Sequence, residues 1–203
     1  MKHRNRGQCL IFNNKTFDSC TRLNERRGTE ADARDLAGAF RSLDFNVSIY
    51  ENPSAKEITS TLDRGDQCPT LASKPKIFFI QACQGDRLDE GVAVRQSFDV
   101  TDAGHGYYRI PNYADFLIAY STVPGYYSWR NTTQGSWFIQ ALTHVLGKHS
   151  QNMDVLTMMT IVNRLVAYDY ESCVPNDPSF HQKKQIPCVT SMLTRLIYFI
   201  PKA

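Results

Sequence analysis

The sequence has no long apolar run and no marked excess of charge of either sign. Its 203 residues carry 23 basic and 20 acidic side chains, for a net charge of +3. No basic run with interleaved aromatics is present, which argues against nucleic-acid binding. The basic start, Met1 to Arg6, is followed only by the short apolar run Cys9–Phe12, too short for a signal peptide or a membrane span. We therefore expect a soluble, cytoplasmic chain with no membrane or nucleic-acid partner.

The cysteines form no CxxC pair. There are six, widely spaced along the chain: Cys9, Cys20, Cys68, Cys83, Cys173 and Cys188. Without such a pair, neither a zinc site nor a thioredoxin motif is supported, so we expect no metal and no cofactor. The interpretation is free, buried thiols in a reducing compartment.

Apolar periodicity predicts alternating strands and helices. Strands are expected at Cys9–Phe12, Phe45–Ile49, Ile77–Ile80 and Phe116–Tyr120, and a helix with Thr29 as its N-cap follows the first strand. Ser54 and Glu57 have the spacing of a capping box. The solid run Ile77–Ile80 is typical of a strand covered on both faces. This alternation predicts an α/β fold with parallel pairing.

A five-residue motif, Gln81-Ala82-Cys83-Gln84-Gly85, follows that buried strand directly. Open α/β sheets place their sites at the carboxyl ends of the strands, so Cys83 stands where a nucleophile would be useful. The alternative is a structural cysteine, which is the usual role of an isolated Cys. The motif resembles the nucleophile signature of caspases, which favours the catalytic interpretation.

Four further motifs carry the resemblance along the chain. They are Arg26-x-Gly28-Thr29 followed by Asp32, Tyr127-Ser128-Trp129-Arg130-Asn131, Gly135-Ser136-Trp137-Phe138, and Lys184-Gln185-Ile186-Pro187-Cys188, the last resembling the strand at the family's dimer interface. The chain is similar to effector caspases, those of insects in particular. The resemblance implies one domain over residues 1–203, a three-layer α/β/α sandwich around a mostly parallel sheet with the order 2-1-3-4-5-6. Residues 1–86 would be large-subunit-like, 87–109 a linker cut after Asp102, and 110–203 small-subunit-like.

The resemblance also implies roles for individual residues. Arg26, Gln81 and Arg130 would line the pocket for the substrate's aspartate, which suits planar, bidentate guanidinium donors. Tyr127 and Trp129, with Ser128 between them, would form the next part of the groove. Asn131 and Trp137 would serve the slot beyond. The alternatives are a solvated surface position for each Arg and ordinary core packing for each Trp.

The catalytic histidine of the family has no counterpart. A cysteine protease needs a base, and in caspases this is a His about 50 residues before the nucleophile, in a Ser-His-Gly turn. That spacing points to the neighbourhood of Ala33, where no His occurs. The five histidines are His3, His105, His144, His149 and His181, none of them in a Ser-His-Gly context. We interpret them as ordinary surface or core histidines.

The gap can be located at Asp63–Arg64. There the family continues through a buried strand, the Ser-His-Gly turn, a hairpin and a helix, and the Gly of that turn also supplies part of the oxyanion hole. The absent strand would lie between the strands at Cys9–Phe12 and Lys76–Ala82. We expect either that these two strands close up and pair, or that the unit Gln8–Asp63 detaches.

Three functional alternatives remain open. The family function is cleavage of proteins after aspartate in apoptosis by an effector-type cysteine endopeptidase, here without its His. The chain could instead be an inactive homologue that regulates an active caspase by pairing or competition, or an incomplete version of a complete enzyme. Expected partners are protein substrates, a second copy or another caspase, an initiator caspase and inhibitor-of-apoptosis proteins.

Overall fold

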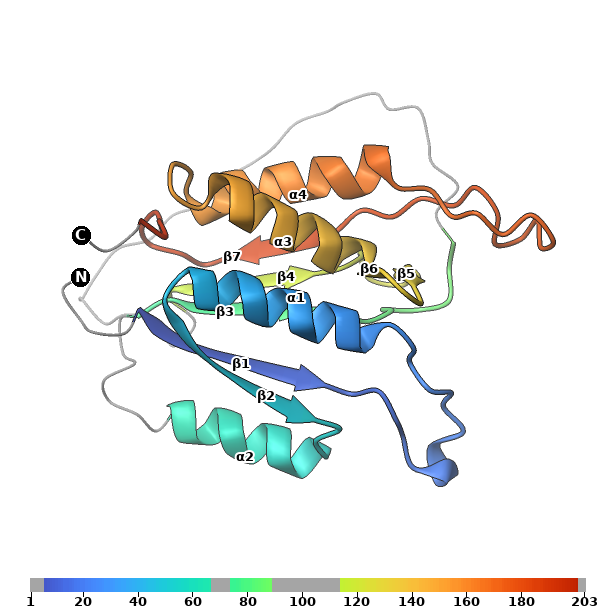
Figure 1. Ribbon diagram of the computed structural model, residues 1–203, viewed down its shortest axis with the longest axis horizontal. Helices are drawn as coiled ribbons and strands as arrows, with labels where there is room; N and C mark the ends of the chain where they lie inside the picture. Colours follow the sequence, from blue (N-terminus) through green and yellow to red (C-terminus); the bar gives the residue numbers. More distant parts are fainter. Residues whose placement is uncertain (1–5, 67–73, 89–113, 201–203) are drawn as a thin grey trace, which may run out of the picture.

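The computed structural model describes residues 6–66, 74–88 and 114–200 (Figure 1). Its elements are β1 (Gly7–Asn13), η1 (Ser19–Thr21), α1 (Thr29–Ser42), β2 (Phe45–Glu51), α2 (Ala55–Asp66), β3 (Lys76–Ile80), β4 (Phe116–Tyr120), β5 (Arg130–Asn131), β6 (Gly135–Ser136), α3 (Trp137–His149), α4 (Val155–Asp169) and β7 (Cys188–Ser191). All four expected strands are present, and the α/β class is confirmed. None of the helices in these residues is long and apolar enough to span a membrane.

The strands form two larger sheets where one was expected. β1 and β2 pair in parallel, with Ile11 opposite Ile49. β4 pairs in parallel with β3 and antiparallel with β7. No pairing joins β1 to β3 within the described residues. Figure 1 shows the two sheets side by side in the order β2-β1, then β3-β4-β7, with the arrowheads of β1, β2 and β4 pointing the same way.

Neither expectation about the flanking strands is met. β1 and β3 have not closed up, and the first unit has not detached, because α1 bridges the two sheets. Ala37 of α1 packs with Ile11 of β1, while the ring of Phe40 lies 6.1 Å from that of Phe79 in β3. The first unit is also held at Phe45, whose ring meets Phe199 edge-on at 5.7 Å.

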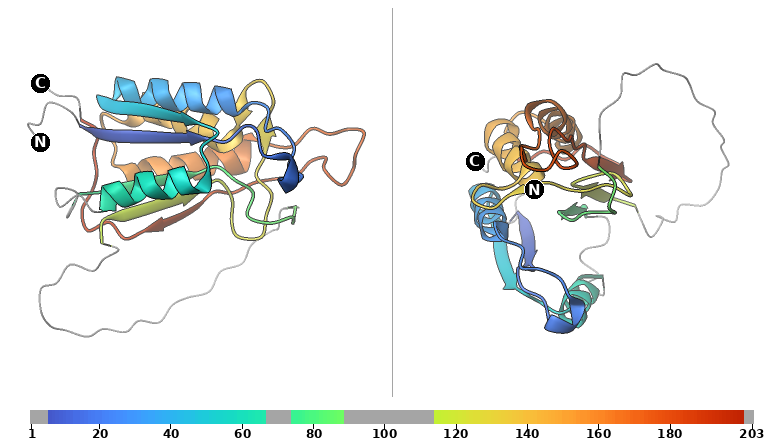
Figure 2. Two further views of the ribbon diagram at one scale, coloured as in Figure 1. Left: turned by 90° about the horizontal axis from the view of Figure 1, so that it is seen from below. Right: turned by 90° about the vertical axis from the view of Figure 1, so that its right-hand side faces the viewer.

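The main core lies where α3 and α4 cover β4. Leu117 of β4, Phe138 and Leu142 of α3, and Met158 and Val162 of α4 are all fully or almost fully buried there. Figure 2 shows α1, α3 and α4 on one side of the strands and α2 on the other. The three-layer arrangement is therefore present, and its thin layer is the one formed by α2.

The thin layer corrects the expectation that β3 is covered on both faces. All five residues of β3 are only half-buried. No residue of α2 from Ala55 to Asp63 is buried, and Leu62 is 38% exposed. β3 therefore keeps part of its apolar surface in water.

Two local expectations have opposite outcomes. The capping box of α2 is confirmed, since Glu57 Oε2 accepts from Ser54 N–H at 2.8 Å and Ser54 Oγ accepts from Glu57 N–H at 3.3 Å. Thr29 is the first helical residue of α1 and not its N-cap; that position is Gly28, with φ of 90°. The five described cysteines are free, as expected, but none is fully buried: Cys20, Cys83 and Cys173 are exposed, and Cys9 and Cys188 are half-buried. Cys68 lies outside the described residues.

Candidate active site

Cys83 lies just beyond the carboxyl end of β3 and is exposed. Its Sγ is 3.4 Å from the backbone N–H of Ser128, which donates to it, and 3.7 Å from the Ser128 carbonyl oxygen. The loop after Cys83 is tied to the same segment, because Gln84 N–H donates to Tyr126 O at 3.0 Å and Arg87 N–H donates to Gly125 O at 3.0 Å. Arg87 was expected to begin an exposed linker. It is exposed, but its backbone is hydrogen-bonded to Gly125.

Two guanidinium groups converge near Cys83. Arg26, from the loop before α1, donates through Nη2 to the Gln81 carbonyl oxygen at 3.1 Å. Burial lowers the pKa of Arg26, and the nearby positive charge of Arg130 in β5 lowers it further. No salt bridge occupies either guanidinium within the described part of the chain. Two half-buried cations without a directly bound carboxylate are arranged to receive an anion.

Gln81 connects this pair to the Cys83 loop. Its Nε2 donates to Ser128 Oγ at 2.8 Å, and its Oε1 is buried with no hydrogen-bond partner. A buried acceptor without a hydrogen-bond partner destabilises the folded chain. The Gln81 amide has nearly the same shape when it is turned by half a rotation, so its oxygen and nitrogen can exchange positions. If the amide turned over, Nε2 would donate a hydrogen bond to a bound carboxylate, and Oε1 would accept one from the Ser128 hydroxyl.

Asp32 places β6 against the start of α1. Its Oδ1 accepts from Ser136 N–H at 2.7 Å and its Oδ2 accepts from Ser136 Oγ at 2.6 Å. Burial raises the pKa of Asp32, and the hydrogen bonds from Ser136 and the charges of Arg130 and Arg26 oppose that rise. Asp32 thus supplies a negative charge close to the two guanidiniums without occupying them.

Gly28 allows the loop with Arg26 to approach β5 closely. A Cβ at this position would stand 2.6 Å from the Asn131 carbonyl oxygen, and its φ of 90° is strained for any L residue. Only glycine fits there, so the motif Arg26-x-Gly28 places Arg26 and Arg130 side by side.

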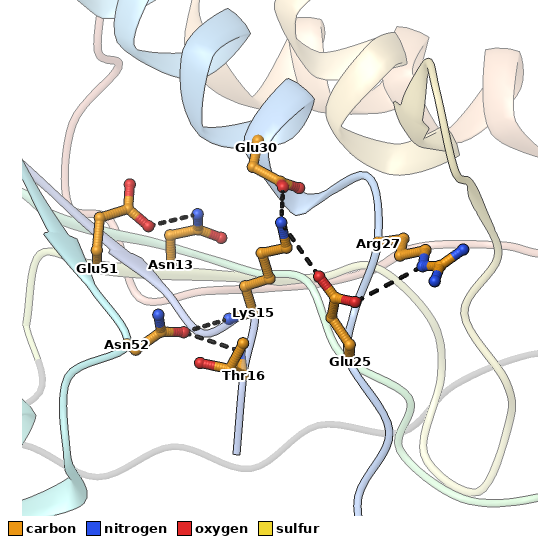
Figure 3. A network of polar contacts seen from close by, with 8 residues as sticks. All are labelled: Asn13, Lys15, Thr16, Glu25, Arg27, Glu30, Glu51 and Asn52. Carbon is orange, nitrogen blue, oxygen red and sulfur yellow. Dashed lines mark hydrogen bonds and ion pairs between the residues drawn. The ribbon is translucent and has the colours of Figure 1, made fainter.

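A charged network holds the loop between β1 and α1 (Figure 3). Lys15 Nζ forms ion pairs with Glu25 at 3.2 Å and with Glu30 of α1. Asn52 Oδ1 accepts from the backbone N–H groups of Lys15 and Thr16 at 2.8 and 2.9 Å. Arg26 N–H donates to Lys15 O at 2.8 Å. The loop that carries Arg26 is therefore fixed to Asn52, which follows β2, and to α1.

Aromatic rings form the wall beyond the guanidiniums. Trp129 stacks on Trp137 with ring centroids 5.7 Å apart, and Tyr170 stacks on the Trp137 ring at 5.5 Å. Phe180 meets Tyr127 edge-on at 5.9 Å and Trp129 at 6.2 Å. Trp137 is only 8% exposed, so much of its ring surface is already covered by neighbouring rings. Three expected groove residues, Tyr127, Trp129 and Trp137, are thereby joined by two unexpected ones, Tyr170 and Phe180.

Gln185 fixes the position of Trp129. Its Oε1 accepts from Trp129 N–H at 2.6 Å, its Nε2 donates to Ser121 O at 2.7 Å, and its side chain is buried. From the sequence, Gln185 was predicted to lie in an interface strand, and its role in holding the Trp129 backbone was not predicted. Phe180, in a polar loop, and Tyr170, the C-cap of α4, were also missed.

The side chain of Asn131 serves its own turn. Its Oδ1 accepts from Thr133 N–H at 2.9 Å, Thr133 Oγ at 2.7 Å and Gln134 N–H at 2.9 Å. The structure thus brings Arg26, Gln81, Tyr127, Ser128, Trp129, Arg130 and Trp137 into one connected region with Cys83, whereas the Asn131 side chain is used locally. Asp102 lies outside the described residues.

None of the three described histidines contacts Cys83. His144 and His149 lie in the second half of α3, which begins beside β6 and runs to the far end of the sheet (Figure 1). His181 Nδ1 accepts from Val174 N–H at 3.1 Å. His3 and His105 lie outside the described residues. In the described part of the chain, no hydrogen bond joins Cys83 to a base.

Comparisons with known proteins agree with this arrangement. The family model of the caspase domain matches residues 6–65 and 63–198. Caspase drICE of Drosophila melanogaster is 43% identical over an alignment that takes in all of this chain and 72% of that protein. Caspase-1 of Spodoptera frugiperda is 42% identical over 98% of this chain and 80% of that protein. The crystal structure of the same Spodoptera caspase superposes with a TM-score of 0.88, covering 100% of this chain and 92% of that one at 41% identity.

The comparisons also locate the gap. The family model matches in two segments that meet at residues 63–65, which is where the sequence reading placed the junction. The drICE alignment runs over 245 positions and takes in all 203 residues of this chain, so at least 42 aligned positions of the relative face no residue here.

Proposed function

The chain belongs to the caspase family, and from that premise we propose that it is an effector-type cysteine endopeptidase that recognises an aspartate in its protein substrates and lacks its catalytic base. The observation that carries the proposal is the convergence of Arg26 and Arg130 beside Gln81 and Cys83. Two planar cations and an amide lie next to an exposed thiol. Such a site can bind a carboxylate side chain of the substrate while the substrate backbone passes the Cys83 thiol.

The groove supplies the rest of the recognition. The substrate's aspartate would bind between the two guanidiniums and the Gln81 amide. The residue before it would pack against Tyr127 and Trp129, and the next would lie toward Trp137. Stacked rings offer apolar area at a low entropic cost, because each has only two side-chain torsions to fix.

Catalysis is expected to be weak. Cys83 Sγ would attack the scissile carbonyl carbon, forming an S–C bond and an oxyanion, and a base would take the thiol proton and give it to the leaving amine. Loss of such a base costs roughly 10²–10⁴ in rate and loss of one oxyanion donor roughly 10²–10³. The two losses need not multiply, but either one leaves a very slow protease.

The cellular role follows from the same proposal. Substrates would be proteins cut after Asp during apoptosis, and the linker 87–109 would be cut in activation of a zymogen, between a large unit 1–86 and a small unit 110–203. A second copy or another caspase would pair through the β7 edge. Initiator caspases and inhibitor-of-apoptosis proteins are further proposed partners, all in the cytoplasm.

A peptide aldehyde ending in aspartate tests recognition separately from turnover. The Cys83 thiol adds across the aldehyde, forming an S–C bond and transferring its proton to the new hydroxyl, with no leaving group to protonate. We expect saturable binding by calorimetry and no binding of the matched aldehyde ending in asparagine. Equal binding of the two aldehydes, or binding that persists in Arg130→Ala, would contradict the proposal.

The alternative function is regulation by an inactive homologue. It is favoured by one observation: the recognition residues are assembled while none of the described histidines forms a hydrogen bond with Cys83. The chain would then hold substrate segments or pair with an active caspase. Adding the chain to an active effector caspase at saturating peptide substrate tests pairing, because a regulator that pairs with the active enzyme changes the rate and a slow enzyme that only binds peptide leaves it unchanged.

A further inference from the structure

We propose that the open position between β1 and β3 binds an extended strand supplied by another polypeptide, running parallel to both. The inference stands on the strand geometry and is independent of the proposed function. It concerns the opening bounded by β1, β3 and α1, whose carboxyl end lies next to the guanidinium pair, since Arg26 donates to Gln81 O directly after β3.

The contacts of α1 with both strands are compatible with an opening one strand wide. α1 contacts both rims, through Ala37 against Ile11 of β1 and Phe40 against Phe79 of β3. Neighbouring strands lie about 4.8 Å apart, so two strands separated by one absent strand lie about 10 Å apart. A helix with its side chains is about 10–12 Å across, so one helix can touch both rims of a one-strand opening.

The rims present matching backbone groups. In the described residues β1 pairs only with β2, and β3 pairs only with β4, so each has one edge without a ladder. Alternate residues of such an edge direct both N–H and C=O toward the empty position. Because β1, β2 and β4 point the same way in Figure 1 and β3 is parallel to β4, an inserted strand would be parallel to both rims.

The side chains around the opening indicate what the strand must carry. On the α1 side the rims contribute Cys9 and Ile11 from β1, and Ile77 and Phe79 from β3, all packed against core residues. On the α2 side the alternate residues of both rims, among them Phe12 and Phe78, are only half-buried. A strand between them would be covered on one face and partly covered on the other, which calls for a mainly apolar segment.

The occupant is the corresponding segment of another caspase chain. The relatives contain at least 42 positions that this chain lacks, and the family model is interrupted at residues 63–65, in the last turns of α2 and one element before β3. The relatives therefore place additional residues between α2 and β3, directly before the strand that forms one rim of the opening. An unrelated strand would pair with the backbone equally well, but it would not match the side chains of α1, β1 and β3.

Hydrogen exchange on the full chain tests the proposal. The probe is a synthetic peptide with the drICE segment that faces the gap, and the control is a peptide of the same composition in scrambled order. A second control carries N-methyl groups on alternate residues, which removes the donors needed for pairing. We expect the first peptide alone to raise protection of β1 and β3 amides at least tenfold and to raise the melting temperature, with β4 and β7 unchanged.

Four outcomes would overturn the proposal. These are unchanged protection of β1 and β3, equal protection by either control peptide, protection confined to the outer edge of β2, and protection that rises with chain concentration in the absence of peptide. The last would mean that a second copy fills the opening. If the isolated chain is insoluble, co-expression with the drICE segment as a separate polypeptide must yield soluble complex, and co-expression with the scrambled segment must not. None of these readouts involves catalysis, so failure here leaves the aldehyde-binding result standing.

Discussion

The carboxylate of Asp32 accepts hydrogen bonds from both the backbone N–H and the hydroxyl of Ser136, which lies 104 residues further along the chain. Ser136 is fully buried, so both of its donors depend on this one acceptor. The pair fastens the start of α1 to the start of α3, and thereby the loop of Arg26 to the strand of Arg130.

Removing this acceptor is expected to destabilise the chain. Asp32→Ala leaves two buried donors unpaired, each at about 1–3 kcal/mol. Asp32→Asn keeps an oxygen that accepts from Ser136 N–H. We expect it to lower the free energy of unfolding by less than about 1 kcal/mol, the net contribution of a typical hydrogen bond. Urea unfolding of both variants measures the difference. Similar losses in the two variants would show that the hydrogen bonds are not what matters.

Asp32→Asn should also tighten binding of aspartyl peptides. The substitution removes a negative charge that lies close to Arg26 and Arg130. The wild-type chain should approach the variant as pH falls, because the pKa of Asp32 is raised and protonation removes the same charge. Calorimetry with the aspartyl aldehyde at two pH values tests this. Weaker binding by the variant at neutral pH would contradict it.

Arg130→Lys should lose at least tenfold in affinity for the aspartyl aldehyde. Lysine keeps the charge but cannot donate two parallel hydrogen bonds to one carboxylate. Arg34→Lys is the matched control, because Arg34 is exposed on α1 and, among the residues that the structure describes, pairs only with Asp35 at 2.9 Å. Equal losses in the two variants would show that Arg130 does not bind the carboxylate.

Stability should fall in alkaline solution through Cys9. Burial raises the pKa of this thiol from 9.0 to about 11. The folded chain therefore keeps a proton that the unfolded chain loses between these values, so stability is fully present below about pH 9 and declines as pH rises to about 11. The loss is at most about 2–3 kcal/mol. Cys9→Ala should flatten this slope in thermal melts, and an unchanged slope would assign the decline to other groups.

Cleavage after Asp102 is a prediction from sequence alone. Asp99-Val100-Thr101-Asp102 is followed by the small residues Ala103 and Gly104, which suits an effector caspase. Incubation with an active effector caspase should yield fragments 1–102 and 103–203 by mass spectrometry. Asp102→Ala should abolish the cut and Asp86→Ala should not. An intact wild-type chain would contradict the prediction.

The sequence predicted the elements well because their signals are local. The capping box at Ser54 and Glu57 and the alternation in β2 depend only on near neighbours. The position of Cys83 after β3 was equally readable, and Arg26 and Arg130 were found because short motifs carry them. The roles of Gln185 and Phe180 were missed because they depend on contacts with Trp129, 56 and 51 residues away in the chain.

The bridging position of α1 was unpredictable for another reason. Its apolar face was evident from Ala33, Ala37 and Phe40, but an apolar face does not specify which strands it covers. The two expected alternatives, that β1 and β3 close up or that the unit Gln8–Asp63 detaches, followed from backbone pairing alone. In the structure, Phe40 fills space against Phe79, and closing the opening would require repacking the contacts that α1 makes with both sheets.

This bridging helix has a consequence for how the chain folds. β1, α1 and β2 are consecutive in sequence and make mostly local contacts, so they can form early as one supersecondary unit. The second sheet needs β7 to reach β4 from about seventy residues away. During synthesis the first unit therefore waits with the Phe40 side of α1 uncovered until the later segments emerge, and that interval is when the nascent chain is most exposed to chaperones and to misassembly.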